Sequence, residues 1–415
     1  MPVIVHLGLG AFHRAHQAAY LQDLIDLGDH SWRLVAGNIV PGPAPASGPY
    51  TLELVAPDGH RELRRIEAID AVLALPGLIA IAADPATAIV SFTVTEAGYA
   101  PDGALYRVLA EILALRRSNS AGPLTLLCCD NLRHNGNSTR RGLLRHLERR
   151  GDSGLLAWTR ANVSLPNAMV DRITPRPAPG QVHLTAEAYR QWVIEDRFLA
   201  GRPDWTRVGV QMVESVQGFE EAKIRMLNAG HSCIAWAGAL RGLRFIHEAV
   251  RDEQILGLAH DFLSNEVMPV LAVRAAAIGL NLPAYRDTVL ARFSNTALAD
   301  TVERVASDSF AKLPGFIVPT LAERLAQGAN IASAAVPPAL FLAMLRRWHA
   351  GDLPFEYRDA AMEPAQARSI CDAADPVAAF CADGQLWGSL AGDARLLEAV
   401  RLAARRIDES QLARS

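Results

Sequence analysis

The stretch that decides the fold is VIVHLGLG at residues 3–10, which runs directly into AFHRAHQAAYLQDLIDLG at residues 11–28. The first is a short apolar run, rich in β-branched residues, that ends in glycines. The second repeats apolar residues at helical spacing. Together they predict a strand, a tight turn and a helix at the start of the chain.

Alternating strand and helix patterns continue from this opening. Such an alternation favours a parallel sheet covered by helices on both faces. From about residue 206 onward long helical patterns dominate and convincing strand patterns end, so we expect an α/β domain over 1–205 and a mainly α-helical domain over 206–415. The further strands are expected at 32–39, 88–94 and 124–129, and helices at 104–117, 140–149, 219–241, 246–264, 337–349 and 394–406.

Composition limits the class of protein. The chain has 415 residues, of which 50% are hydrophobic, enough for two packed cores. A net charge of -3 leaves no basic excess for nucleic acid, so a small molecule is the expected partner. The five cysteines form no C-x-x-C pair, and no leader or bilayer-length apolar stretch is evident, so we expect a cytoplasmic protein with reduced thiols and no membrane partner.

The glycine turn GLGAFHR, residues 8–14, carries the first two glycines of a dinucleotide-binding turn. His13 stands where the third glycine is usual, so we expect the helix to pack less closely on the strand. On this cue alone, nucleotide binding and a purely structural turn are equally good interpretations. The second strand ends in AGNIVPG without an acid for the adenosine ribose, so Asn38 either donates to the ribose or caps a turn, and the choice of NAD or NADP stays open.

A polar set interrupts an apolar helix at KIRMLNAGH, residues 223–231. At about 3.6 residues per turn, Glu220, Lys223, Asn228 and His231 fall within roughly 140° of one helix face. One interpretation is an exposed stripe with a weak Glu220–Lys223 ion pair and a core histidine. The other makes Lys223 a general base, which requires its pKa to fall from about 10.4 to about 7 or 8 by burial.

Other polar residues follow apolar strands, where open α/β sheets meet ligands. They occur in TVTEAGY, residues 93–99, and in CCDNLRHNGN, residues 128–137. Asp130 and Asn135 also suit turns, since such side chains bond their own backbone. Asp171 and Arg172 form either a buried ion pair or part of a site. His13 and His16 lack partners at metal-ligand spacing, so no metal is expected.

Taken together, GLGAFHRAHQ, TVTEAGY, CDNLRHNG, MVDRITP, QWVIEDRF, KIRMLNAGH and ARFSN resemble the polyol-specific long-chain dehydrogenases, a family that includes mannitol dehydrogenases and the fructuronate and tagaturonate reductases. The resemblance runs in order from about residue 3 to about residue 315, and WHAGDLPFEYRD and DPVAAF extend it. It implies a Rossmann-type N-terminal domain, a helical C-terminal domain, hydride transfer without a metal, and an active site between the domains.

The resemblance also implies residue roles. Lys223 is the base, Asn228 and His231 bind the substrate, Asn131 and Asn228 steady the developing oxyanion, and Glu220 serves proton exit. Arg292 and Asp171 are candidate substrate contacts. Coenzyme contacts are expected from Gly8, Gly10, Phe12, His13, Arg14, Asn38, Thr95, Glu96, Asp130 and Asn131.

The expected reaction is NAD-dependent oxidation of a linear polyol to a ketose, with D-arabinitol to D-xylulose favoured and the enzyme expected to be a monomer. Mannitol or sorbitol oxidation and hexuronate reduction are the close alternatives, and a nucleotide-binding module without catalysis is the alternative from another class. Three segments are shorter than the family pattern: after AGNI, after TEAGY, and between TPRP and QWVIED. The first shortening removes the segment that commonly carries acids near the ribose, so NADP is not excluded.

Overall fold

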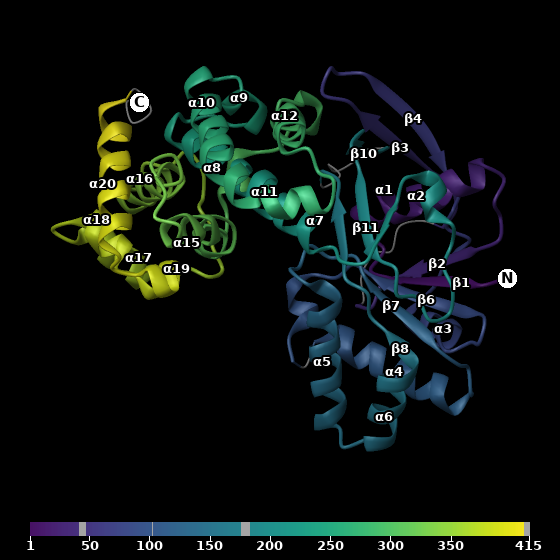
Figure 1. Cartoon of the computed structure of the whole chain (residues 1–415). Helices are drawn as coiled ribbons and strands as arrows, with labels where there is room; N and C mark the ends of the chain where they lie inside the picture. The colour runs from purple at the N-terminus through teal and green to yellow at the C-terminus, as the bar shows by residue number, and fades with distance from the viewer. Residues whose placement is uncertain (41–46, 102, 176–182, 411–415) are drawn as a thin grey trace. The chain divides into compact units, whose positions relative to one another are not determined.

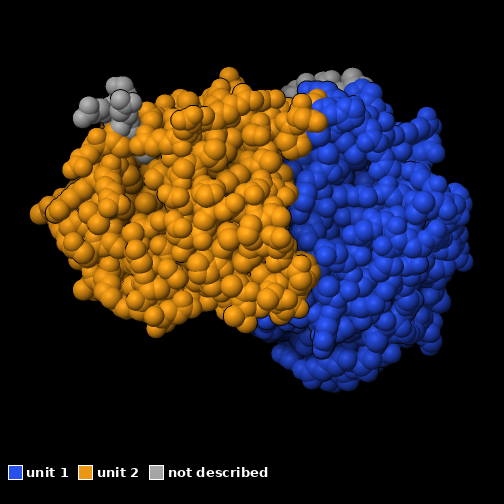
Figure 2. Space-filling model, turned by 45° about the horizontal axis from the view of Figure 1, so that its top comes forward, with its two compact units in different colours: residues 1–56, 60–217 blue, residues 57–59, 218–415 orange. Residues whose placement is uncertain are grey.

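The computed structural model describes residues 1–40, 47–101, 103–175 and 183–410, apart from the side chain of Glu96. The shortened segment after AGNI, and part of the one between TPRP and QWVIED, lie outside these ranges. The chain divides into two compact units, which Figure 2 colours separately. Unit 1 comprises residues 1–56 and 60–217, and unit 2 comprises residues 57–59 and 218–415.

Unit 1 is built on a parallel sheet whose strand order, within the described residues, is β5-β2-β1-β6-β7-β8. The chain builds outward from β1 in one direction, then returns to β1 and builds in the other. The carboxyl ends of β1 and β6 therefore form the topological switch point where such sheets bind ligands. The strands are β1 (Val3–Leu7), β2 (Arg33–Gly37), β5 (Ala71–Val72), β6 (Thr87–Phe92), β7 (Leu124–Cys128) and β8 (Val163–Ser164).

Successive residues of the central strands face two different cores, as the period of a strand requires. In β1, Val3, Val5 and Leu7 join one cluster and Ile4 joins the other. Helices α3 to α6 cover the first face, whereas α1 and α2 belong to the second, and Figure 1 shows the two layers on opposite sides of the sheet. These helices are α1 (Ala11–Ala15), α2 (Gln17–Asp26), α3 (Leu75–Ala82), α4 (Ala104–Ser118), α5 (Asn135–Arg149) and α6 (Ser153–Asn162).

Two smaller sheets, ordered β10-β3-β4 and β12-β11-β9, complete unit 1. The sequence analysis predicted none of these strands, and β12 shows that the expectation of no strand after residue 206 was wrong. The reason is visible in β4, RELRRI, which is mostly exposed and gains its stability from pairing with β3. The strands are β3 (Tyr50–Val55), β4 (Arg61–Ile66), β9 (Ala168–Asp171), β10 (Leu184–Glu187), β11 (Gln191–Glu195) and β12 (Gln211–Val213), and the 3-10 turns are η1 (Glu96–Tyr99) and η2 (Trp205–Val208).

The described part of unit 2 is helical, which confirms the predicted fold class. Its elements are α7 (Gln217–Ala222), η3 (Lys223–Asn228), α8 (Ala229–Leu240), α9 (Ile246–Ala249), α10 (Glu253–Phe262), η4 (Leu263–Val267), α11 (Met268–Ala277), α12 (Leu282–Phe293), η5 (Thr296–Leu298), α13 (Val302–Ala306), α14 (Ser309–Lys312), η6 (Leu313–Ile317), α15 (Val318–Ala326), α16 (Val336–Ala350), α17 (Pro364–Asp372), α18 (Pro376–Cys381), α19 (Gly384–Trp387), η7 (Gly388–Leu390) and α20 (Ala394–Glu409). No single helix of the described residues is long and apolar enough to cross a membrane, although one bent pair, Glu253–Ala277 with Leu282–Phe293, passes that test together.

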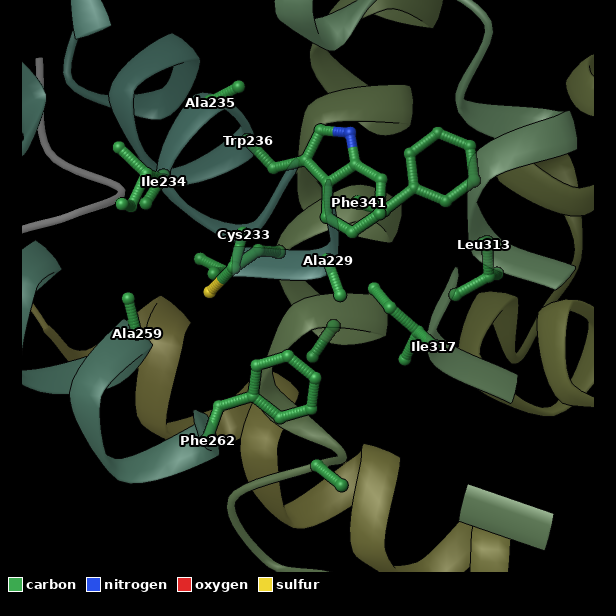
Figure 3. Packing of buried hydrophobic residues seen from close by; sticks show 14 of the residues in the cluster. Ala229, Cys233, Ile234, Ala235, Trp236, Ala259, Phe262, Leu313, Ile317 and Phe341 are labelled. Carbon is green, nitrogen blue, oxygen red and sulfur yellow. The ribbon is translucent and has the colours of Figure 1, made fainter. Parts of the chain in front are cut away.

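Helix α8 runs through the centre of unit 2 and is buried along almost its whole length. Its small residues let neighbouring helices approach closely. A Cβ added at Gly238 would lie 3.0 Å from the side chain of Ala249. The Trp236 ring stacks on Phe341 at 5.2 Å between centroids, and its Nε1 donates to Ser309 Oγ at 2.7 Å. Figure 3 shows this packing, with Trp236 beside Phe341 and Cys233 near Phe262.

Candidate functional site

The glycine turn after β1 requires glycine at its first position. Gly8 has φ +101, and a Cβ there would lie 1.9 Å from the carbonyl oxygen of Thr93. The Gly8 amide donates to Gly37 O at 2.7 Å, and Thr93 Oγ1 donates to Gly8 O at 2.8 Å. The turn is therefore wedged between the ends of β2 and β6, where a side chain would collide with the main chain.

Gly10 is different, because open space surrounds it. A Cβ added there would meet no atom within 4 Å, and its backbone is extended, with φ -94. A side chain is thus excluded by neither packing nor conformation, which leaves access to the backbone amides at the start of α1. Asn38 holds the turn in place, since its Oδ1 accepts from Leu9 N at 2.9 Å. The turn-capping role considered for Asn38 is therefore present in the structure.

His13 is buried and lies flat against His6, with 3.4 Å between ring centroids. Its Nδ1 bonds to Gln17 Oε1 at 3.2 Å. Burial lowers the pKa of His13 to about 3, so the ring is neutral. The helical path breaks three residues later at His16, where α1 ends and α2 begins.

His16 bonds to the backbone carbonyl of Gln191 at 3.0 Å, and burial likewise lowers its pKa to about 3. This contact ties the helix break to β11. No group of three or more histidine, cysteine or carboxylate side chains arranged for a metal occurs among the described residues.

Arg14 supplies a cation beside the glycine turn. Its guanidinium lies over the Tyr50 ring at 5.3 Å, while Tyr50 donates to Arg14 O at 2.7 Å. The Arg14 Nε and the His13 Nε2 are buried without a hydrogen-bond partner among the described residues. Phe12 stacks on His16 at 4.9 Å. Open backbone at Gly10, a nearby cation and two unsatisfied nitrogens fit an anionic group such as a coenzyme diphosphate.

The ends of β6 and β7 are joined by side-chain bonds. Both carboxylate oxygens of Asp130 accept from Val94 N at 3.0 Å, and Tyr99 donates its phenol to the same carboxylate. Burial raises the pKa of Asp130 to about 6, although these hydrogen bonds oppose the rise. Asp130 thus orders the strand end, while Thr95 and Asn131 are exposed there. The backbone of Glu96 begins η1, but its side chain lies outside the description.

Asn135 anchors the loop that carries Asn131. Its Nδ2 donates to the carbonyls of Cys128, Asp130 and Ala168, and its Oδ1 accepts from the amides of Gly136 and Ala168. This buried side chain therefore fixes the exit from β7 and its approach to β9. The turn interpretation considered for Asn135 matches these bonds.

Asp171 and Arg172 lie at the end of β9 and are both buried. Arg172 does not serve as a surface cation, because it donates to Ala15 O at 2.5 Å and to Glu187 O at 2.8 Å. It thereby ties the end of α1 to β10. Asp171 acts electrostatically on His16 and Tyr20, which follow the glycine turn in the sequence.

In unit 2, the segment Lys223–Asn228 is a π-helix inserted between α7 and α8. Such insertions occur frequently at functional sites. A π-turn accommodates one more residue than the same turn of an α-helix. The side chains that follow it are therefore rotated back about the helix axis by about 100°. The angle between Lys223 and Asn228 falls from about 140° to about 40°, and that between Lys223 and His231 from about 80° to about 20°. The π-turn therefore gathers the polar set onto a narrower face than the regular helix predicted.

This face is not an exposed stripe. Glu220 is 4% exposed and Lys223 is 6% exposed. Asn228 and His231 are half-buried. One ion pair of this helix joins Arg225 Nε to Glu221 Oε2 at 2.7 Å, and Arg225 also bonds Glu323 at 2.6 Å. The solvated-surface interpretation is therefore wrong, because burying charged groups demands partners or a function.

His231 lies among charged side chains of unit 2. Its ring stacks on Phe293 at 4.4 Å, and its Nε2 lies 3.4 Å from Asp300 Oδ2. Burial lowers the pKa of His231 to about 3, so the ring is neutral at pH 7. Arg292, next to Phe293 on α12, is 2% exposed and its charge acts on His231. The structure thus brings Arg292 and His231 together.

Asp300 and Lys312 were not predicted from the sequence. Asp300 is separated from His231 by a long stretch of chain, and no local pattern marks it. Lys312 did leave a signal, because the chain contains only two lysines, Lys223 and Lys312, against 39 arginines. Lys312 Nζ donates to Val305 O at 2.8 Å and to Ser307 O at 2.5 Å. Both lysines lie in unit 2, and every other basic Lys or Arg position of the chain is an arginine.

Comparisons with known proteins cover the whole length. A family model described as the mannitol dehydrogenase Rossmann domain matches residues 2–207, and one described as the mannitol dehydrogenase C-terminal domain matches residues 215–408. The chain is 48% identical to D-arabinitol 4-dehydrogenase of Ralstonia nicotianae, covering 100% of this chain and 98% of the relative. It is 42% identical to D-arabinitol 4-dehydrogenase of Klebsiella pneumoniae, with 96% of each covered.

A solved structure is also similar. Pseudomonas fluorescens mannitol 2-dehydrogenase, in a ternary complex with NAD and D-mannitol, matches with a TM-score of 0.83 and 29% identity, covering 99% of this chain and 92% of that one. These findings confirm the resemblance drawn from the motifs.

Proposed function

The chain belongs to the mannitol dehydrogenase family, and from this premise we propose that it oxidises a secondary alcohol of a linear polyol to a ketone with NAD as hydride acceptor. The favoured reaction is D-arabinitol to D-xylulose, because the relatives of that activity match over nearly their full lengths. The observation that carries the proposal is the buried π-turn with Lys223, Asn228 and His231 on one face.

In this proposal unit 1 holds the coenzyme. The amides at Gly10 and the Arg14 cation bind its diphosphate, while Phe12 and His13 shape the turn and Asn38 keeps it open. Thr95, Glu96, Asp130 and Asn131 form the surroundings of the nicotinamide, with Asp130 acting through the strand ends that it joins. When bound, the nicotinamide supplies the acceptor for the hydride that leaves the carbinol carbon.

Unit 2 supplies the proton chemistry. Lys223 Nζ, as a neutral amine, accepts the proton of the substrate hydroxyl. The hydrogen of the carbinol carbon leaves with both C–H bonding electrons as hydride. The products are a ketone and a lysine ammonium. Asn228 and Asn131 donate to the oxygen as negative charge develops on it. Glu220 passes the proton onward, while Arg292 and Asp171 contact other hydroxyls of the polyol.

The test is a substrate panel combined with a lysine variant. D-arabinitol, D-mannitol and D-sorbitol are compared as alcohols and D-fructuronate as a carbonyl substrate, each with both coenzymes. Lys223→Met should lower kcat/KM by about 10²- to 10⁴-fold, the usual worth of a general base. Lys223→Arg should not restore it, because a guanidinium keeps its proton.

Controls separate chemistry from folding. Both variants should keep the wild-type melting temperature to within a few degrees and bind NADH as wild type does. Turnover of Lys223→Met within a few-fold of wild type would contradict the base assignment. A marked preference for fructuronate would favour hexuronate reduction, for which the buried Arg292 offers a carboxylate partner.

The monomeric state and cytoplasmic location expected from the sequence stay predictions. Light scattering coupled to gel filtration measures the mass of the protein in solution and so tests the monomeric state. Cell fractionation tests the cytoplasmic location. A mass of twice 44.8 kDa would contradict the monomer.

A further inference from the structure

The contact between His231 and Asp300 bears on which hydrogen bonds His231 can make. The imidazole Nε2 is buried and lies 3.4 Å from Asp300 Oδ2. Phe293 covers one face of the ring at an interplanar angle of 15°, which limits its rotation. The distance is long for an N–H···O bond, but catalytic hydrogen bonds are often long before substrate is bound.

Asp300 is itself fixed in place. Its two carboxylate oxygens accept from Arg304 Nε and Nη2 at 2.5 Å each. Its backbone carbonyl accepts from Ile246 N at 2.9 Å. Burial opposes ionisation of Asp300, yet the Arg304 hydrogen bonds and the surrounding charges hold its pKa below the usual range. The carboxylate therefore stays ionised, and Arg304 holds it with Oδ2 3.4 Å from His231 Nε2.

Lys312 supports the same loop. It caps the carbonyls of Val305 and Ser307 at the end of α13, the helix that begins just after Asp300. A cation at a helix C-terminus is stabilising, and a compact ammonium can reach two carbonyls at once. The charged groups of the described residues that act on His231 are Asp300, Arg304, Lys312 and Arg292. Asp300 is the acid among them.

We propose that Asp300 is a positioning residue that fixes the tautomer of His231, with the proton on Nε2 toward Asp300 and the lone pair on Nδ1. A neutral imidazole has one donor and one acceptor nitrogen, and a carboxylate can only accept. His231 therefore accepts a hydrogen bond from a substrate hydroxyl through Nδ1. This specifies how His231 takes part in the substrate binding that the resemblance implies. The inference rests on the proposed function for the identity of the substrate only.

The Asp300→Asn variant should reverse this arrangement. Arg304 offers only donors, so it retains the amide oxygen of the new side chain and leaves the amide NH₂ facing His231. The NH₂ group donates to His231 Nε2, so the imidazole proton moves to Nδ1. Nδ1 then donates a hydrogen bond, whereas in the wild type it accepts one. A polyol hydroxyl that donated to Nδ1 would then lose its partner. We expect kcat/KM to fall about 10- to 100-fold, by analogy with residues that orient a metal-ligating histidine.

The direct readout is ¹⁵N NMR of protein labelled at histidine, at pH 7, with the His231 signals identified by their loss in His231→Gln. Wild type should show a protonated Nε2 and an unprotonated Nδ1, and Asp300→Asn should show the opposite pattern. A purely structural role for Asp300 would not predict that exchange. The control is Arg304→Gln, which leaves the Asp300 carboxylate and should keep the wild-type tautomer.

Each outcome decides something. A wild-type His231 that is protonated on Nδ1, or on both nitrogens, would overturn the proposal whatever the activity. If Asp300→Asn fails to fold, the wild-type spectrum and that of Arg304→Gln still test it. An enzyme that shows the predicted tautomer but turns over no polyol would refute the proposed function and leave the role of Asp300 standing.

Discussion

Gly8 and Gly10 belong to the same turn, but alanine substitutions at them should have opposite effects. Neighbouring atoms leave no room for a side chain at Gly8, whereas open space surrounds Gly10. In Gly8→Ala, the new methyl would lie 1.9 Å from Thr93 O at a φ of +101. The unfavourable backbone conformation costs about 1 to 2 kcal/mol and overpacking about 1 to 3 kcal/mol. The melting temperature of unit 1 should therefore fall by roughly 5 to 15 °C.

Gly10→Ala is the matched control for folding. Its Cβ meets no atom within 4 Å and its backbone is extended, so stability should be unchanged or slightly higher. The same methyl would occupy the space that we assign to the coenzyme diphosphate. The methyl group should reduce the binding free energy of NADH by about 1 to 3 kcal/mol, which weakens binding roughly 10- to 100-fold.

The assays are thermal melting and titration of NADH fluorescence on both variants. The reasoning predicts a loss of stability in Gly8→Ala and a loss of coenzyme affinity at wild-type stability in Gly10→Ala. Wild-type NADH affinity in Gly10→Ala would refute the diphosphate assignment, and a wild-type melting temperature in Gly8→Ala would refute the packing account.

Two further predictions concern unit 1. Burial lowers the pKa values of His13 and His16 to about 3 and that of His6 well below its usual value, so between pH 6.5 and 3 the unfolded chain binds protons that the folded chain does not. Together these three histidines should lower the free energy of unfolding by about 4 kcal/mol per pH unit as the pH falls through that range, and His13→Phe should reduce the slope by about a third in urea titrations; an unchanged slope would contradict the assignment. Asn135→Ala should lower the free energy of unfolding by about 2 to 4 kcal/mol because buried backbone groups lose their partners, while the exposed Asn137→Ala should be neutral in the same melts.

The large sheet could be predicted because its evidence is local. Each of β1, β2, β6 and β7 is a short apolar run next to a helical pattern, so periodicity alone locates it. The small sheets could not be predicted in the same way. Strand β3 pairs with β10 across more than a hundred residues, and β4 exposes most of its charged side chains. Their stability comes from pairing, which a local pattern does not record.

The polar helix was found from its sequence, but its geometry was not. An arc computed at 3.6 residues per turn assumed a regular helix, whereas the π-turn narrows the angle between Lys223 and His231. The residues in and around KIRMLN give no rule for placing such an insertion. Burial of this face required the surrounding helices of unit 2, which no single segment specifies.

The partners of candidate residues were the least predictable part. Asp300 meets His231, and His6 stacks on His13, only because tertiary packing brings distant positions together. Composition gave one indication that residue spacing did not. Because the chain has only two lysines, each of them is a candidate for a specific role. Lysine is the cationic side chain that can lose its proton in a buried setting, so its retention at Lys223 fits a base.

The most direct test of the central claim is the titration of Lys223 itself. Competitive acetylation over a range of pH, read by peptide mass spectrometry, resolves both lysines because there are only two. Lys312 is the second reporter, and burial lowers its pKa to about 8. The proposed base requires the reactivity of Lys223 to rise with a midpoint of about 7 to 8. A midpoint of about 10.4, the value of a solvated lysine, would contradict it.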